Sequence, residues 1–78
     1  MTTTDVIMLA FDLLETHGLT PNWSFALDNA KRRFGACCFN TRRISMSRLL
    51  LANASETAIR NTLLHEIAHA LGGRESWT

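Results

Sequence analysis

Two segments, one near each end of the chain, carry apolar residues at the three- and four-residue spacing of an amphipathic helix. The first covers residues 4–17, with Thr4 as a candidate N-cap and Gly18 as a candidate C-terminal stop. The second covers residues 56–71 and follows Ser55, which can cap its first turn. The positions expected to face the core are Val6, Leu9, Ala10, Leu13 and Leu14 in the first helix and Ile59, Leu63, Leu64, Ile67, Ala68, Ala70 and Leu71 in the second.

Between these helices, three short runs alternate apolar and polar residues, which is the pattern of half-buried strands. They cover residues 23–28, 33–39 and 42–47, and Asn40-Thr41 favours a tight turn between the last two. The sequence therefore predicts an α+β fold of order α-β-β-β-α. In this fold a small antiparallel three-stranded meander packs on both helices. We expect one domain over residues 1–78, because no linker or repeat divides the chain.

A chain of this size often needs an additional source of stability. The 78 residues are 46% hydrophobic and 19% charged, as in an ordinary globular domain. A chain this short hides only roughly 60 to 65% of its unfolded surface, so small domains often need a metal, disulfides or a partner. The adjacent Cys37 and Cys38 give neither a disulfide framework nor a paired zinc-ribbon spacing. We expect both cysteines to be small core residues of a protein in a reducing compartment, the cytoplasm.

The beginning of the chain lacks the basic segment of a signal peptide, and Asp12 interrupts its longest apolar run. We therefore expect no signal peptide and no membrane association.

The charge is unevenly distributed, although the net charge is only +1. Residues 31–48 contain six basic residues and no acidic one, whereas the rest of the chain is acidic. Such a segment is either a surface that binds the phosphates of DNA, weakly and with steep salt dependence, or a solvated sheet face. The basic residues are Lys31, Arg32, Arg33, Arg42, Arg43 and Arg48.

The second helix contains the motif His65-Glu66-x-x-His69. Residues four apart lie one turn above the other on the same face of a helix, so both imidazoles can reach one zinc ion. A glutamate next to the first histidine can take the proton of a metal-activated water, as in metalloproteases. This predicts a zinc site with Glu66 as general base. The alternative is two surface histidines that flank a helical glutamate.

A catalytic zinc ion usually has three protein ligands, so one more is expected. Glu75 stands six residues after His69, at the spacing of the third ligand in the metzincin pattern, and Gly72 allows the turn that would bring it back. His17 is a second candidate, but its position near the end of the first helix also suits a helix cap.

These features together resemble the SprT-like family of zinc metallopeptidases, which includes the Spartan proteases that digest proteins crosslinked to DNA. The resemblance covers about residues 5–71 and rests on the N-terminal helix and on three further segments. The segments are residues 23–35, which end in Arg33-x-Gly35, Arg43-Ile-Ser-Met-Ser47, and Leu63-Leu-His-Glu-Ile-Ala-His-Ala-Leu71.

The resemblance implies a minimal zincin fold and a zinc-dependent endopeptidase. His65 and His69 would then bind Zn2+, Glu66 would be the general base, and a strand edge would hold an extended protein or peptide substrate. Compact relatives of this kind suit a bacterial or phage-infected cytoplasm. DNA is a further expected partner, through the basic residues of the meander.

The family carries a third zinc-binding histidine further along the chain, whereas no histidine follows His69 here. Glu75 replaces it, another chain completes the site, or the site is incomplete. The alternative function is a non-catalytic zincin-fold domain that binds a protein or DNA, and the chain can also be a fragment of a longer protease. The sequence specifies neither the substrate nor the oligomeric state.

Overall fold

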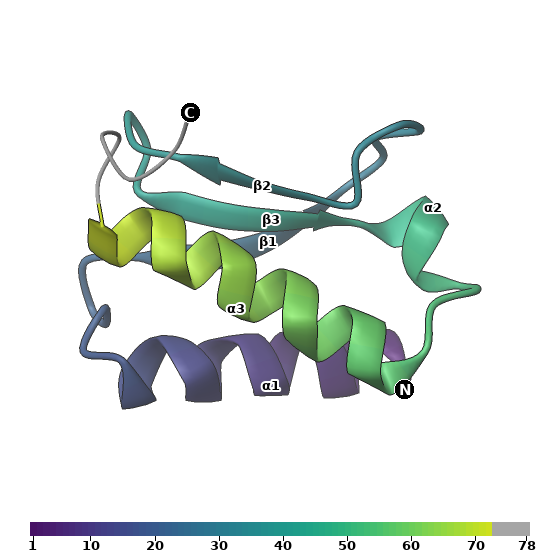
Figure 1. Ribbon diagram of the computed structural model, residues 1–78, viewed down its shortest axis with the longest axis horizontal. Coiled ribbons are helices and arrows are strands. Elements are labelled where there is room, and N and C mark those ends of the chain that lie inside the picture. The colour runs from purple at the N-terminus through teal and green to yellow at the C-terminus, as the bar shows by residue number, and fades with distance from the viewer. Residues whose placement is uncertain (73–78) are drawn as a thin grey trace.

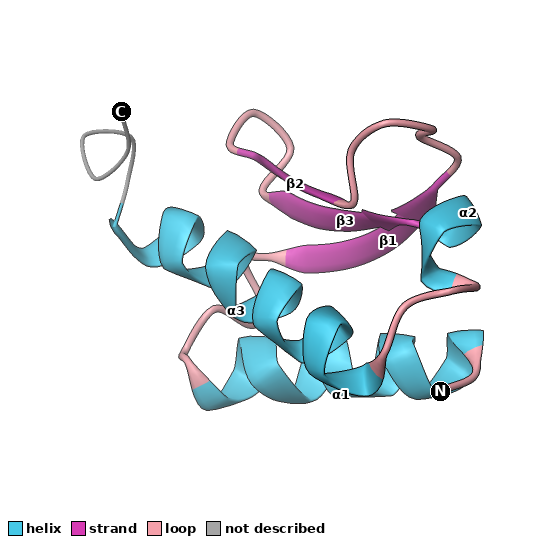
Figure 2. Cartoon of the chain, turned by 45° about the vertical axis from the view of Figure 1, so that its right-hand side comes forward, coloured by secondary structure: helices cyan, strands magenta, loops and turns pink. Residues whose placement is uncertain are grey.

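The computed structural model describes residues 1–72, which form a three-stranded sheet with two long helices packed on one of its faces (Figures 1 and 2). This confirms the α+β fold and the predicted order, with one additional short helix, α2, directly after the last strand. The elements are α1 (Thr3–Thr16), β1 (Ser24–Asp28), β2 (Gly35–Cys38), β3 (Arg43–Ser47), α2 (Arg48–Leu51) and α3 (Glu56–Gly72).

The predicted antiparallel meander is wrong in its strand order. The order in the sheet is β1-β3-β2, with β3 parallel to β1 and antiparallel to β2. The reason lies in residues 29–34, which pass over the end of β3 instead of turning back beside β1. There the Ser47 hydroxyl donates a hydrogen bond to the Ala30 carbonyl (2.5 Å), and the Ser47 amide donates to the Phe34 carbonyl (2.8 Å). The place beside β1 is therefore left to β3.

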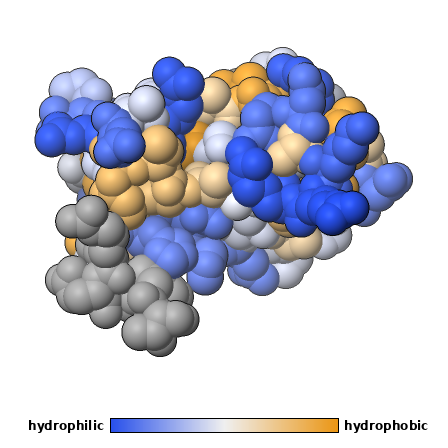
Figure 3. Space-filling view, turned by 90° about the horizontal axis from the view of Figure 1, so that it is seen from above, coloured by the Kyte–Doolittle hydropathy of each residue, from blue (hydrophilic) through white to orange (hydrophobic). Residues whose placement is uncertain are grey.

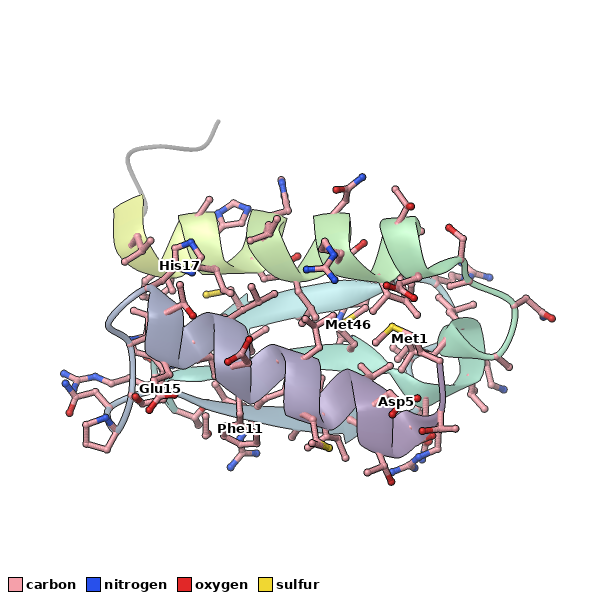
Figure 4. The ribbon with its side chains drawn as sticks, turned by 90° about the horizontal axis from the view of Figure 1, so that it is seen from below. Met1, Asp5, Phe11, Glu15, His17 and Met46 are labelled. Atoms are coloured by element: carbon pink, nitrogen blue, oxygen red, sulfur yellow. The ribbon has the colours of Figure 1, made fainter. Side chains whose placement is uncertain are left out.

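The central position of β3 follows from its side chains. Ile44 and Met46 point toward the helices and are only 1% and 0% exposed. Figure 4, seen from the helix side, shows Met46 between α1 and α3, and Phe11 on the side of α1 away from α3. A middle strand has a neighbouring strand on each side, so its large apolar side chains are covered more completely than those of an edge strand. The core they join consists of Val6, Ala10, Leu14, Leu19, Phe25, Ile59, Leu63 and Ile67.

The ends of α1 are set by local hydrogen bonds. The N-cap is Thr2, two residues before the expected Thr4, because Thr2 and Asp5 form a reciprocal capping box. The Thr2 hydroxyl accepts from the Asp5 amide (3.1 Å), and the Asp5 carboxylate accepts from the Thr2 amide (3.0 Å). At the other end Gly18 has a φ of 74°, the left-handed conformation expected of a residue that stops a helix.

Helix α3 begins as predicted, with the Ser55 hydroxyl accepting from the Ala58 amide (3.1 Å). Its buried face is narrower than expected, because Leu64 and Leu71 are 37% and 54% exposed and Ala68 is also exposed. The face turned toward β2 is occupied by Thr62 and Glu66 instead. Within residues 1–72, no helix is long and apolar enough to cross a membrane.

Candidate metal centre

The two histidines of the motif lie one turn apart on α3 and their rings converge. The Nε2 atoms of His65 and His69 are 3.2 Å apart, and the ring planes are nearly perpendicular, at 83°. Two imidazoles that share a tetrahedral zinc ion at about 2.05 Å require their nitrogens to be about 3.3 Å apart. His65 is exposed and His69 is half-buried, so the point on which they converge is open to solvent. The pair therefore fits two positions of a zinc site.

Glu66 lies on a different side of α3, facing β2. It is 8% exposed and is the one charged residue buried among residues 1–72. The two ion pairs in this part of the chain join Arg33 to Asp28 and Arg60 to Glu56, so neither neutralises Glu66. Carboxylates are rarely buried without a compensating charge, because desolvation of the ion costs free energy.

The structure brings together two of the expected protein ligands. Among the residues it describes, no group of three histidine, cysteine, aspartate or glutamate side chains is arranged to hold a metal ion. Glu75 lies outside the described residues, and its role as third ligand stays a prediction. His17 forms the C-cap of α1, where its Nδ1 lies 2.8 Å from the Leu13 carbonyl oxygen. The capping interpretation of His17 is thus confirmed.

The two cysteines lie in different environments on β2. Cys37 is half-buried and faces the helices, where burial, followed by the negative charge of Glu66, raises the pKa of its thiol to about 11. Cys38 is exposed, and hydrogen bonds from Thr41 lower the pKa of its thiol. The expectation that both are buried core residues is therefore wrong for Cys38. Cys37 remains a protonated, uncharged neighbour of Glu66 at neutral pH.

The basic residues do not form one continuous strip. Lys31, Arg32 and Arg33 lie in the connection between β1 and β2, which passes over the end of β3 and thus lies close to Arg48. Two of these four contact neighbouring side chains: Arg33 pairs with the Asp28 carboxylate at 2.6 Å, and Arg48 donates to the Asn29 side chain at 3.0 Å. The remaining two, Arg42 and Arg43, lie at the start of β3, at the opposite end of the sheet.

Figure 3 views the molecule from the β2 side and shows hydrophilic side chains toward both ends of this face, with more hydrophobic atoms between them. The six basic residues thus form two separate groups, at opposite ends of the sheet.

One residue beside the site was not assigned a role from the sequence. Gly35, in the Arg33-x-Gly35 segment, is the point at which β2 approaches Thr62 and Glu66. A glycine inside an alternating strand pattern is itself a signal of close backbone approach, and this signal was present in the sequence.

Comparison with known protein families gives a match between residues 6–73 and the SprT-like family. A search of curated proteins finds no match to the chain.

Proposed function

Since the chain belongs to the SprT-like family, we propose that it is a zinc-dependent metallopeptidase that hydrolyses peptide bonds within a protein substrate. The observation that carries the proposal is the convergence of the His65 and His69 Nε2 atoms, 3.2 Å apart, in a motif whose Glu66 is buried. Two ring nitrogens at ligand spacing together with an adjacent carboxylate are the parts that metal-assisted hydrolysis needs.

In this mechanism His65 and His69 would hold the metal through their converging Nε2 atoms. A zinc ion, when bound, supplies Lewis-acid chemistry that polarises a carbonyl and lowers the pKa of water. The Glu66 carboxylate accepts the proton of the attacking water and then donates it to the amine nitrogen that leaves. Its burial against β2 restricts the carboxylate to few orientations, which favours proton transfer at a defined position.

The substrate would bind along β2. Among residues 1–72 this strand lies at the edge of the sheet and pairs with β3 on one side only. An extended peptide can add to such an edge through main-chain hydrogen bonds, which tolerate many side chains. Because Glu66 lies beside Gly35 at the beginning of β2, a peptide paired with this strand would pass close to the general base.

The decisive experiment compares Glu66→Gln with Glu56→Gln, an isosteric change at an exposed glutamate of the same helix. We expect wild-type protein to bind about one zinc per chain and to cleave denatured casein. Glu66→Gln should retain zinc and lose at least about 100-fold in kcat, the range of general acid–base catalysis. Glu56→Gln should match wild type. A zinc-supplemented wild-type protein that contains no zinc by elemental analysis would disprove the proposal.

A second function, a non-catalytic domain that binds a protein or DNA, is supported by one observation. Residues 1–72 group only two of the three ligands that catalytic zinc usually has. A zinc-loaded wild-type protein that leaves casein intact would favour this function. For DNA, fluorescence anisotropy with a labelled duplex should then show binding that weakens steeply between 50 and about 200 mM salt and is reduced in Lys31→Ala and Arg42→Ala.

A further inference from the structure

Strand β2 and helix α3 come unusually close at Gly35. A β-carbon built on Gly35 would lie 2.8 Å from the Thr62 Cγ2 atom and 3.3 Å from both the Cγ and the Oε2 atoms of Glu66. Real β-carbons essentially never approach another heavy atom to less than 3.0 Å. Any other residue at this position would therefore displace the side chain of Thr62, that of Glu66, or both.

The requirement for glycine is one of space and not of backbone conformation. The contrast with Gly18 makes this clear: Gly18 has a φ of 74°, but an added β-carbon there would meet no atom of residues 1–72 within 4 Å. Gly35 has no such positive φ, so its backbone is accessible to any L-residue. The two glycines thus serve different purposes, and only Gly35 serves the contact with Glu66.

The strand cannot easily move away to make room for a larger residue. Gly35 pairs in register with Met46 of β3, which is 0% exposed at the centre of the core. Moving β2 outward would disturb this pairing and the packing of Met46, and close-packed cores resist such shifts. The side chains on α3 can therefore move more easily than the strand. Thr62 and Glu66, which lie one turn apart on the face of α3 toward β2, are the side chains that would be displaced.

We propose that Gly35 is a positioning residue for the Glu66 carboxylate: the missing side chain lets β2 lie against Thr62 and Glu66 and thereby fixes the orientation of the carboxylate that follows His65 on α3. The catalytic consequence rests on the proposed function, whereas the contact itself does not. The proposal also gives a role to the Arg33-x-Gly35 segment, which the hydrolytic mechanism leaves unexplained.

The test is Gly35→Ala, which adds the one carbon atom considered above. We expect kcat to fall at least about tenfold, because small displacements of a catalytic group have large effects on rate. KM and zinc affinity should stay within about threefold, because the nearest atoms belong to Thr62 and Glu66 and not to His65 or His69. An unchanged kcat would overturn the proposal.

Two further variants separate positioning from general loss of stability. Gly18→Ala makes the same chemical change at a glycine whose φ is unfavourable for alanine but where the added β-carbon would meet none of the described atoms within 4 Å. It should lower Tm and leave kcat unchanged when activity is measured at a temperature at which all variants are folded. Thr62→Ser removes the methyl group that lies nearest to the added carbon, so it should restore part of kcat in the Gly35→Ala background. Equal losses of kcat in Gly18→Ala and Gly35→Ala would contradict the proposal.

A structural measurement decides the matter even if wild-type protein hydrolyses no peptide. In NMR spectra of wild type, a nuclear Overhauser effect should connect the Gly35 Hα protons with the Glu66 Hγ protons. In Gly35→Ala, the cross-peaks between Glu66 and its other neighbours should change, whereas they should persist in Gly18→Ala. Absence of the wild-type cross-peak, or an unchanged Glu66 pattern in Gly35→Ala, would show that Gly35 does not position Glu66.

Discussion

Helices α1 and α3 pack side by side on the same face of the sheet, yet they differ in the kinds of residue that they bury. The buried residues of α1 are Val6, Ala10 and Leu14, all apolar and at helical spacing. The buried residues of α3 are Ile59, Leu63 and Ile67, which follow the same spacing, and in addition Glu66. Hydrophobic packing alone explains the buried residues of α1. It does not explain the burial of Glu66 in α3.

This difference indicates where function lies in the molecule. Sequences usually agree with their folds at every level, and local conflicts concentrate at functional or strained sites. In α1 the charged residues Asp5 and Glu15 lie on its outer surface, as Figure 4 shows. In α3 a carboxylate lies inside the interface with β2, one residue from His65. The predictions that follow ask whether the two helices differ in function while contributing equally to stability.

The largest effect is expected in the part that both helices share, the apolar core. Leu14→Ala in α1 and Leu63→Ala in α3 each truncate a side chain that is 1% exposed. Each should lower the free energy of unfolding by about 3 kcal/mol, out of a total of about 4 to 12 kcal/mol for a chain of this size. Urea denaturation measures these losses. Leu64→Ala, the neighbouring but exposed position on α3, should cost under about 0.5 kcal/mol, and a cost near that of Leu63→Ala would refute the observed burial.

The next effect distinguishes α3 from α1. His69→Ala should weaken zinc binding at least about 100-fold, equivalent to about 2.7 kcal/mol, because it removes one of two converging nitrogens. His17→Ala, at the end of α1, removes a helix cap and should leave zinc affinity unchanged. Competition with a chromogenic chelator measures both. Equal zinc affinities of wild type and His69→Ala would show that the converging rings are not a metal site.

A smaller effect, an increase in stability, is expected at Glu66, the charged residue that α3 buries. Glu66→Met replaces the buried carboxylate by an apolar side chain of similar length, which should stabilise the zinc-free protein by about 1 kcal/mol because no charge has to be desolvated. The same variant should lack peptidase activity. Thermal unfolding in the presence of a chelator measures the first outcome, and a lower Tm than wild type would mean that Glu66 stabilises the fold in its own right.

The sequence was sufficient to predict what depends on local patterns. Both long helices, the Ser55 cap, the Gly18 stop and the membership of the SprT-like family follow from spacing and motif. The strand order did not, because it depends on how residues 29–34 cross the end of β3, a path fixed by long-range hydrogen bonds to Ser47. Alternation within a strand is the same in either order.

The candidate site likewise has one part that follows from the local sequence and one part that depends on long-range packing. The converging rings of His65 and His69 are a local consequence of four-residue spacing on a helix. The burial of Glu66 against Gly35 joins two segments about thirty residues apart in the chain, and only the packing of β2 on α3 brings them together. For that reason the motif was recognised from the sequence and the contact that holds its glutamate was not.

The smallest effect concerns the start of α1 and its dependence on pH. Hydrogen bonds from the Thr2 backbone and side chain lower the pKa of Asp5 in the folded protein. A lowered folded-state pKa means that the capping box contributes stability above the unfolded-state pKa of about 3.9 and loses this contribution as the pH falls through the folded-state value. Asp5→Ala removes the titrating half of the box, so its Tm should lie below that of wild type at pH 6 and approach it near pH 2. The corresponding acid dependence should be unaffected by Thr4→Ala, since Thr4 does not cap the helix. A difference in Tm between wild type and Asp5→Ala that is the same at both pH values would mean that the charge of Asp5 contributes nothing to the cap, and that the first turn of α1 is held by neutral hydrogen bonds alone.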